Sequence, residues 1–280
     1  MNTETPCADV PRRFDTLALT RRGRLLTITL NRPGSRNAVN REMHEELAEV
    51  FVYAAADVHS DVIVLTGAGT AFSAGGDLEH ISRNAATPEL FDEEVRLAKR
   101  IVFSMLDLDK PLVCRLNGHA VGLGASLALL CDVIFAADTA KIGDPHVALG
   151  LVAGDGGAVI WPARIGLGRA KEYLLTGELL TARKAEEVGL INHCVAAQDL
   201  DGVVDAFCER LLNGATNAIR WTKVLLNMEL KRVAHSVMDA GIAYESVAVR
   251  SADHREGVRA LIEKRKPVFG SGCEESGDRD

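Results

Sequence analysis

Aromatic residues make up only 5% of this 280-residue sequence, and it has no apolar run long enough to span a membrane as a helix. Its first residues also lack the apolar segment of a signal peptide, so we predict a cytoplasmic protein. Positive charge is in deficit: 32 Lys and Arg residues stand against 39 Asp and Glu, for a net charge of −7. This balance argues against nonspecific binding to nucleic acid or to an anionic membrane.

The six cysteines form no CxxC pair and no other spacing typical of a metal site. Most of them stand in apolar runs, where a cysteine behaves as a small hydrophobic residue. We therefore predict reduced thiols and no metal.

What the sequence does contain is an alternation of strand and helix patterns in its first half, followed by helices. The strands read as apolar runs, which indicates an α/β core whose sheet is buried on both faces. Strands are predicted at 16–20, 24–30, 62–67, 111–118 and 131–138. Helices are predicted after Asn40 and at 89–108 and 123–130. Beyond about residue 155 we predict helices only, at 181–189, 198–213, 216–232, 233–250 and 253–265.

We divide the chain accordingly into two parts and two tails. Residues 13–197 are predicted to form the α/β core with the active site, and 198–269 a helical C-terminal region. Residues 1–12 and 271–280 are polar and aperiodic, and we predict loose tails there.

Two glycine-rich turns are candidates for ligand binding. The first, AFSAGGDL (71–78), follows a predicted strand, and the second, NGHAVGLGA (117–125), joins a strand directly to a helix. Glycine permits positive φ and close approach of backbone N–H groups to a ligand, and the first N–H groups of a helix lack intrahelical partners. The turns match neither the dinucleotide-binding fingerprint nor the P-loop. Either one alone could be a simple tight connection, but the second has the chemistry of an oxyanion hole.

Together with further motifs, the two turns resemble the crotonase superfamily, the enoyl-CoA hydratase/isomerase group. The resemblance runs from about Thr16 to Phe269. Its other markers are ITLNRP with Asn37, Ala38 and Asn40, LGL at 149–151, TGELLTARKAEEVGLIN at 176–192 and SADHREGVRALIEKRKPVF at 251–269.

This resemblance implies a spiral of ββα units with a helical C-terminal region used in trimer contacts, and hence a homotrimer or a hexamer. It implies an acyl-CoA substrate, with coenzyme A carried as part of the substrate and no separate cofactor. The expected enolate-stabilising donors are the N–H groups of Ala74 and Leu123. The turn residues expected beside them in the substrate pocket are Gly75, Gly122 and Gly124. Lys264 and Lys266 are candidates for binding the phosphates of coenzyme A, although such a charge run is often simply solvated.

The sequence departs from the family at the two glutamates that hydratases use to add water. Ser126 stands at the first of these positions and His146 at the second. Because one general acid or base is worth roughly 10²- to 10⁴-fold in rate, we predict poor enoyl-CoA hydration.

His146 is followed nine residues later by Asp155, and a histidine oriented by an aspartate is a competent general base. The pair resembles the β-diketone hydrolase branch of the superfamily, which cleaves C–C bonds by a retro-Claisen route. Asp155 could instead cap the helix that follows it. His119 is expected as a pocket wall, and Asp77 as a residue that braces the first turn. The alternatives are thus an acyl-CoA enzyme, a CoA-independent β-diketone hydrolase and a non-catalytic family member.

Overall fold

The structure, a computed structural model, describes residues 5–6 and 14–270, apart from the side chains of 5–6 and 93–95. A seven-stranded sheet lies at its centre, in the order β1-β2-β3-β4-β5-β7-β10. The β1–β2 and β2–β3 pairs are antiparallel, and the remaining pairs are parallel. Its strands are β1 (Thr5–Pro6), β2 (Leu17–Arg22), β3 (Leu25–Leu30), β4 (Val62–Gly67), β5 (Leu112–Leu116), β7 (Val133–Ala137) and β10 (His193–Val195). A smaller sheet contains β6 (Ala120–Val121), β8 (Lys141–Gly143) and β9 (Leu180–Thr181).

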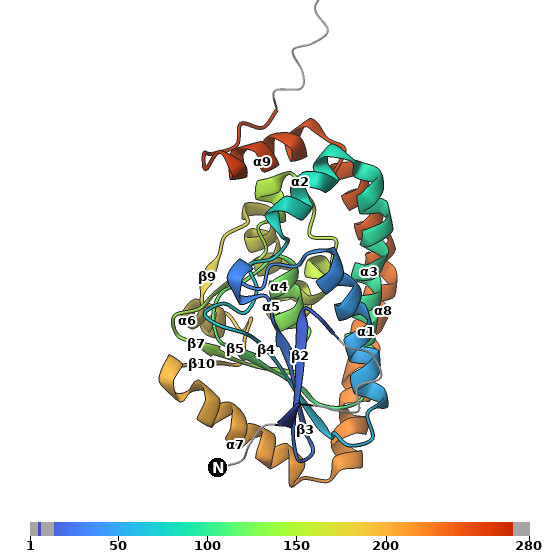
Figure 1. The fold of residues 1–280 in the computed structure, drawn as a ribbon, viewed down its shortest axis with the longest axis vertical. Helices are drawn as coiled ribbons and strands as arrows, with labels where there is room; N and C mark the ends of the chain where they lie inside the picture. The colour runs from blue at the N-terminus through green and yellow to red at the C-terminus, as the bar shows by residue number, and fades with distance from the viewer. Residues whose placement is uncertain (1–4, 7–13, 271–280) are drawn as a thin grey trace, which may run out of the picture.

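Helices cover both faces of the large sheet, which is why its strands read as apolar runs. Ile63 and Cys114 face the core formed with α1, α3, α4 and α5, whereas Val64 and Val113 face α7. Figure 1 shows α7 beneath the sheet and α1, α3 and α8 along one side. The helices are α1 (Arg41–Ala56), α2 (Leu78–Ala86), α3 (Pro88–Asp107), α4 (Leu123–Leu129), α5 (Gly157–Thr176), α6 (Ala182–Glu187), α7 (Leu200–Leu212), α8 (Thr216–Ala248) and α9 (Ala252–Ile262). Short 3₁₀ turns are η1 (Pro33–Ser35), η2 (His146–Leu149) and η3 (Ala197–Asp199).

The hairpin and the buried strands that the sequence predicts are confirmed, but three expectations are wrong. The helices predicted at 216–232 and 233–250 are one continuous helix, α8, because no glycine or proline stands near their junction. The part expected to be only helical contains β9 and β10, and β10 extends the sheet parallel to β7. Thr5–Pro6, expected in a loose tail, pairs with β2.

Within the described part of the chain, no helix has both the length and the hydropathy that a membrane crossing requires. Cys114, Cys131, Cys194 and Cys208 are free thiols.

Candidate active site

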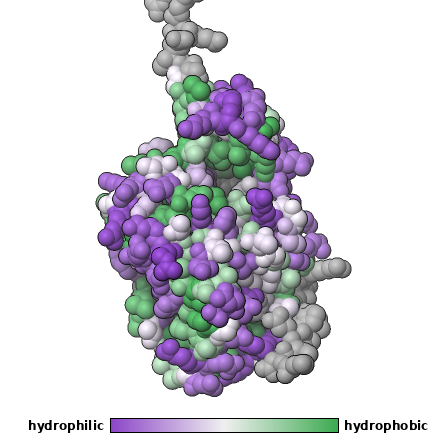
Figure 2. All heavy atoms as spheres, turned by 90° about the vertical axis from the view of Figure 1, so that its left-hand side faces the viewer, coloured by the Kyte–Doolittle hydropathy of each residue, from purple (hydrophilic) through white to green (hydrophobic). Residues whose placement is uncertain are grey.

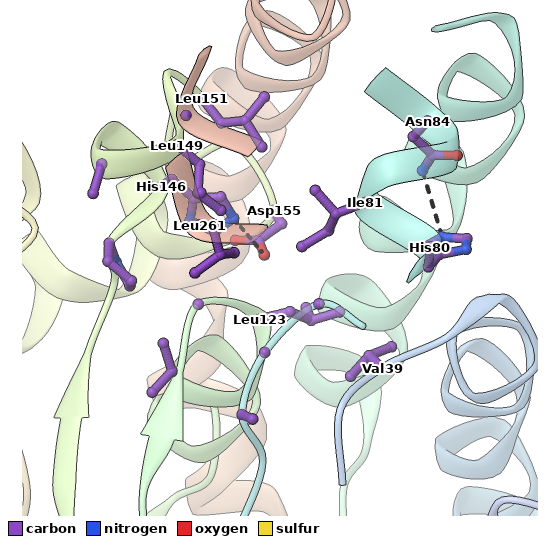
Figure 3. Close-up of a pocket in the computed structure, with 18 of the residues that line it drawn as sticks. Val39, His80, Ile81, Asn84, Leu123, His146, Leu149, Leu151, Asp155 and Leu261 are labelled. Carbon is purple, nitrogen blue, oxygen red and sulfur yellow. Dashed lines mark hydrogen bonds and ion pairs between the residues drawn. The ribbon is translucent and has the colours of Figure 1, made fainter. Parts of the chain in front are cut away.

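A cavity of about 450 Å³ lies where the segments after β4 and β5 meet α2, α8 and α9. Its volume is within the roughly 300–1,000 Å³ of ordinary small-molecule sites, and such sites often lie beyond the carboxyl ends of parallel strands. Figure 3 shows Ile81, Leu123, Leu149, Leu151 and Leu261 around it, so much of its wall is apolar. On the face shown in Figure 2, hydrophobic surface also lies directly beneath the hydrophilic top of the molecule, where Figure 1 places α9.

The two glycine turns lie against each other, and residues of both line the cavity. The Val121 N–H donates to the Ser73 carbonyl oxygen at 3.0 Å. Gly75 has φ +84°, and a Cβ there would lie 2.7 Å from the Val121 carbonyl oxygen. A Cβ on Gly124 would lie 2.7 Å from the Ser73 Cβ. Close packing of the turns therefore requires glycine at both 75 and 124. Gly75 and Gly122 line the cavity, whereas Gly124 is buried and does not line it.

The backbone donors differ in part from those expected. The Ala74 N–H already donates to the Arg36 carbonyl oxygen at 3.0 Å, so Ala74 is not available to a ligand. Two residues later, Gly76 lines the cavity, and its N–H has no acceptor among the described residues. The N–H of Leu123, the first residue of α4, likewise has no acceptor in that part of the chain. The available donors are thus Gly76, in place of Ala74, and Leu123.

His146 lines the cavity between two aspartates. Its Nδ1 forms a short hydrogen-bonded ion pair with Asp144, and its Nε2 lies 3.5 Å from Asp155 Oδ2. The Ser126 hydroxyl donates to the other oxygen of Asp155 at 3.2 Å. Ser126 itself is fully buried and lies outside the cavity lining. The carboxylate of Asp155 therefore contacts both Ser126 and His146, the residues that stand where the family resemblance implies two glutamates.

The charges around His146 determine its protonation. Burial opposes the imidazolium, but the carboxylates of Asp144 and Asp155 outweigh it and raise the pKa of His146 well above its ordinary value. Burial also raises the pKa of Asp155, against the opposing effect of His146. The two carboxylates therefore favour the protonated form of His146, and burial favours the neutral form.

Glu245 of α8 completes this cluster, and the sequence analysis missed it. Its side chain lines the cavity, only 4% of the residue is exposed, and its Oε2 has no hydrogen-bond partner among the described residues. Burial and the neighbouring Asp155 raise the pKa of Glu245 to about 8. The sequence pattern that could have indicated Glu245 is its place on the apolar stripe of a helix, where Met238, Ile242, Glu245 and Val249 follow one another at helical spacing.

Two other expected pocket residues lie outside the cavity lining. His119 is exposed, and its Nδ1 accepts the Lys141 N–H at 3.2 Å. Asp77 caps α2 by accepting the Glu79 N–H at 3.1 Å, and its other oxygen pairs with Arg32 at 3.0 Å. Burial raises the pKa of Asp77, but the Arg32 contact outweighs it and the net shift is downward.

The C-terminal charge run is also arranged differently from the expectation. Lys264 and Lys266 are exposed and do not line the cavity, whereas Arg265 and Pro267 do. Arg265 pairs with Glu256, with a hydrogen bond of 2.9 Å between Nη2 and Oε2. Of this charge run, the basic side chain that lines the cavity is therefore Arg265, the residue between the two expected lysines.

Asp144, His146 and Asp155 have the ligand types of a metal site, and one ligand atom from each lies within 4.8 Å of the others. In this arrangement both ring nitrogens of His146 face carboxylates. A metal ion would have to replace these contacts.

Comparison with known proteins gives a consistent result. The model of the enoyl-CoA hydratase/isomerase family matches residues 20–272. The chain is 35% identical to a 1,2-epoxyphenylacetyl-CoA isomerase of Escherichia coli, over 88% of this chain and 94% of the relative. An enoyl-CoA hydratase/isomerase structure from Mycobacterium paratuberculosis is 38% identical, with a TM-score of 0.85 over 90% of this chain and all of that one.

A β-diketone hydrolase from Anabaena, solved with (S)-3-oxocyclohexyl acetic acid, is 27% identical. Its TM-score is 0.79 over 85% of this chain and 95% of that one. These similarities confirm the crotonase-type fold that the motifs predicted.

Proposed function

The chain belongs to the enoyl-CoA hydratase/isomerase family, and we propose that it is an enzyme that converts an acyl-CoA thioester through an enolate. The observation that carries this proposal is the convergence of Gly76, Leu123 and the His146–Asp155 pair on one cavity. Two N–H groups can hold the oxygen on which negative charge develops, and a titratable pair beside them can carry a proton. The Escherichia coli relative is named for an acyl-CoA, which supports this substrate class.

In this proposal, the thioester oxygen accepts hydrogen bonds from the N–H groups of Gly76 and Leu123. Asp144 fixes the orientation of the His146 ring through Nδ1, and Nε2 exchanges a proton with the substrate or with Asp155. Glu245, whose pKa burial raises to about 8, is a neutral acid at pH 7 and can supply a proton to the enolate carbon. Coenzyme A enters as part of the substrate, and these steps use no separate cofactor.

A second candidate function is hydrolysis of a C–C bond in a β-diketone or a β-ketoacyl-CoA. It is favoured by the single carboxylate that contacts both Ser126 and His146, and by the similarity to a β-diketone hydrolase. Water would add to one carbonyl carbon and give its proton to the His146–Asp155 pair. The C–C bond would then break, and its electron pair would form the enolate of the leaving fragment. Glu245 would protonate the carbon of this enolate.

A three-substrate panel tests both candidates: crotonyl-CoA, a β-ketoacyl-CoA and a free cyclic β-diketone, each followed by mass spectrometry. Turnover of a thioester without the free diketone supports the acyl-CoA function. Turnover of the diketone alone supports the second function. The absence of turnover with all three, from protein that is folded by circular dichroism, contradicts both and favours a non-catalytic family member.

We also propose that the chain assembles with itself, as a trimer or a dimer of trimers. Trp221, Leu225 and Met228 of α8 are more than 60% exposed and follow one another at helical spacing. Large apolar side chains gathered on one helix face favour contact with another protein surface.

A further inference from the structure

A buried histidine of α9 is hydrogen-bonded to the turn that carries His146. His254 is only 1% exposed, and its Nδ1 lies 2.8 Å from the carbonyl oxygen of Leu149, the last residue of η2. A carbonyl oxygen only accepts, so Nδ1 carries a hydrogen and donates it. Burial lowers the pKa of His254 although the Leu149 contact opposes this, so the ring is neutral at pH 7 and Nδ1 is its one donor.

Two glycines allow the backbones of α9 and η2 to come into direct contact. A Cβ on Gly257 of α9 would lie 2.8 Å from the Leu149 Cα, and a Cβ on Gly150 would lie 2.7 Å from the His254 backbone nitrogen. Gly150 also has φ +65°, a conformation that glycine adopts without strain. A larger residue at either position would push the two elements apart, so the position of η2 depends on α9.

The η2 turn in turn determines where the His146 ring lies. His146 is its first residue and Leu149 its last, and the Leu151 N–H donates to the His146 carbonyl oxygen at 2.9 Å. Because this bond closes the turn, a shift of the Leu149 carbonyl also moves the backbone of His146. The same α9 contributes Leu261 to the cavity wall, and Figure 3 shows Leu261 and Leu149 on the side of the cavity that holds His146.

We propose that His254 is a positioning residue, whose hydrogen bond to Leu149 holds the His146 ring in place between its two aspartates. This inference rests on the proposed function, in which His146 exchanges a proton. His254 does not line the cavity, so it acts only through η2. A displacement of about 1 Å at a reacting group can lower a rate roughly 10²-fold, so one hydrogen bond outside the lining is enough to change turnover.

His254→Leu and His254→Asn test the proposal because they differ in the donor. Leucine has no N–H, whereas the asparagine amide can place an N–H near the position of the histidine Nδ1. The substrate is the one that the three-substrate panel identifies. His254→Leu should lower kcat roughly 10- to 10²-fold and change KM less than about threefold, because no lining residue is altered. His254→Asn should keep kcat within about threefold of the wild type.

Ser251→Ala is the matched control for an effect on stability alone. The Ser251 hydroxyl oxygen accepts the backbone N–H of His254 at 3.0 Å as the N-cap of α9, so its loss weakens the helix but leaves the histidine ring. Thermal unfolding should show that Ser251→Ala and His254→Leu are both destabilised, but Ser251→Ala should keep the wild-type kcat.

Gly257→Ala replaces His254→Leu if the latter does not fold by circular dichroism. The added methyl group would push α9 away from Leu149, while alanine favours a helix more than glycine does. This variant should also lower kcat roughly 10- to 10²-fold, although His254 is unchanged.

Crystal structures of the wild type and of the His254 variants separate failure of this inference from failure of the proposed function, since they need no substrate. The His146 ring should move by at least about 0.5 Å relative to Asp155 in His254→Leu, or in Gly257→Ala where that variant replaces it, and should stay in place in His254→Asn. If the ring moves in this way but no substrate of the panel is turned over, the proposed function alone fails. An unmoved ring, wild-type kcat in the variant without the contact, equal impairment of His254→Asn, or an equal loss of kcat in Ser251→Ala would each overturn the inference.

Discussion

The Nε2 atom of His146 lies 3.5 Å from Oδ2 of Asp155, and both side chains line the same cavity. The separation is slightly longer than a normal hydrogen bond, as is common in catalytic sites without ligand. Asp144 on the other ring nitrogen makes this a three-residue arrangement in which a carboxylate orients the ring.

His146→Ala and Asp155→Asn should each lower kcat/KM on the true substrate by roughly 10²- to 10⁴-fold, the range for one general acid or base. The double variant should lose little more than either single one, because residues that act as a unit are not additive. Steady-state kinetics of the three variants measures this. His119→Ala, which changes an exposed residue outside the cavity lining, is the control. Fully additive losses would show that the two residues act separately, and wild-type activity of Asp155→Asn would reduce Asp155 to a structural role.

Crotonyl-CoA hydration should be slow, with kcat/KM below roughly 10⁴ M⁻¹s⁻¹, the lower end of the usual enzyme range. The physical reason is that Ser126 and His146 stand at the two positions where the family resemblance implies the glutamates that add water, and one general acid or base is worth roughly 10²- to 10⁴-fold in rate. Loss of the enoyl-thioester absorbance measures the rate. A value in the upper part of the range would contradict this account.

Glu245→Gln should make the protein more stable at pH 8 than the wild type, with the difference shrinking towards pH 4.5. Burial raises the pKa of Glu245 from its ordinary 4.5 to about 8, so the native protein holds a proton that the unfolded chain releases. Each pH unit in this interval therefore lowers the free energy of unfolding, by at most about 1.4 kcal/mol. Thermal unfolding of both proteins at several pH values measures the effect.

The same variant tests the chemical role of Glu245. If Glu245 supplies a proton, kcat should fall by roughly 10²-fold or more, since an amide cannot act as the acid. Unchanged kcat together with the stability effect would make Glu245 a buried acid without a catalytic role.

Leu123→Pro should lower kcat by roughly 10²- to 10³-fold, the usual effect of removing one oxyanion donor. Leu123 is the first residue of α4, where proline fits the helix geometry and removes only an N–H that has no acceptor among the described residues. Leu123→Ala keeps the N–H while also losing the leucine side chain, so it should lose much less activity. Equal losses in the two variants would show that the side chain matters and the N–H does not.

Trp221→Glu combined with Leu225→Glu should dissociate the oligomer, because the charges would be buried in the proposed contact between copies. Light scattering after size-exclusion chromatography gives the mass of the wild type and of the variant. A wild-type monomer at micromolar concentration would refute the proposed assembly.

Local sequence was sufficient for much of the fold and for part of the site. Apolar runs predicted the central strands, and ordered motifs predicted the family. The His146–Asp155 pair was also accessible, because its members are nine residues apart and their types carry the chemistry. The strands β9 and β10 are only two and three residues long, too short for a recognisable strand pattern in the sequence. These residues are extended because they pair with β8 and β7.

Only the tertiary structure decided which groups are available in the cavity. Whether a backbone N–H is free depends on a distant acceptor: the Arg36 carbonyl oxygen accepts from Ala74, so Gly76 is a donor that remains among the residues of this turn that line the cavity. Protonation depends in the same way on burial by distant elements, because α8 brings Glu245 to a cluster that lies about 90 residues earlier in the sequence. Hydrogen-bond availability and desolvation are set by what packs around a group, and a linear sequence specifies residue types and local spacing but not those neighbours.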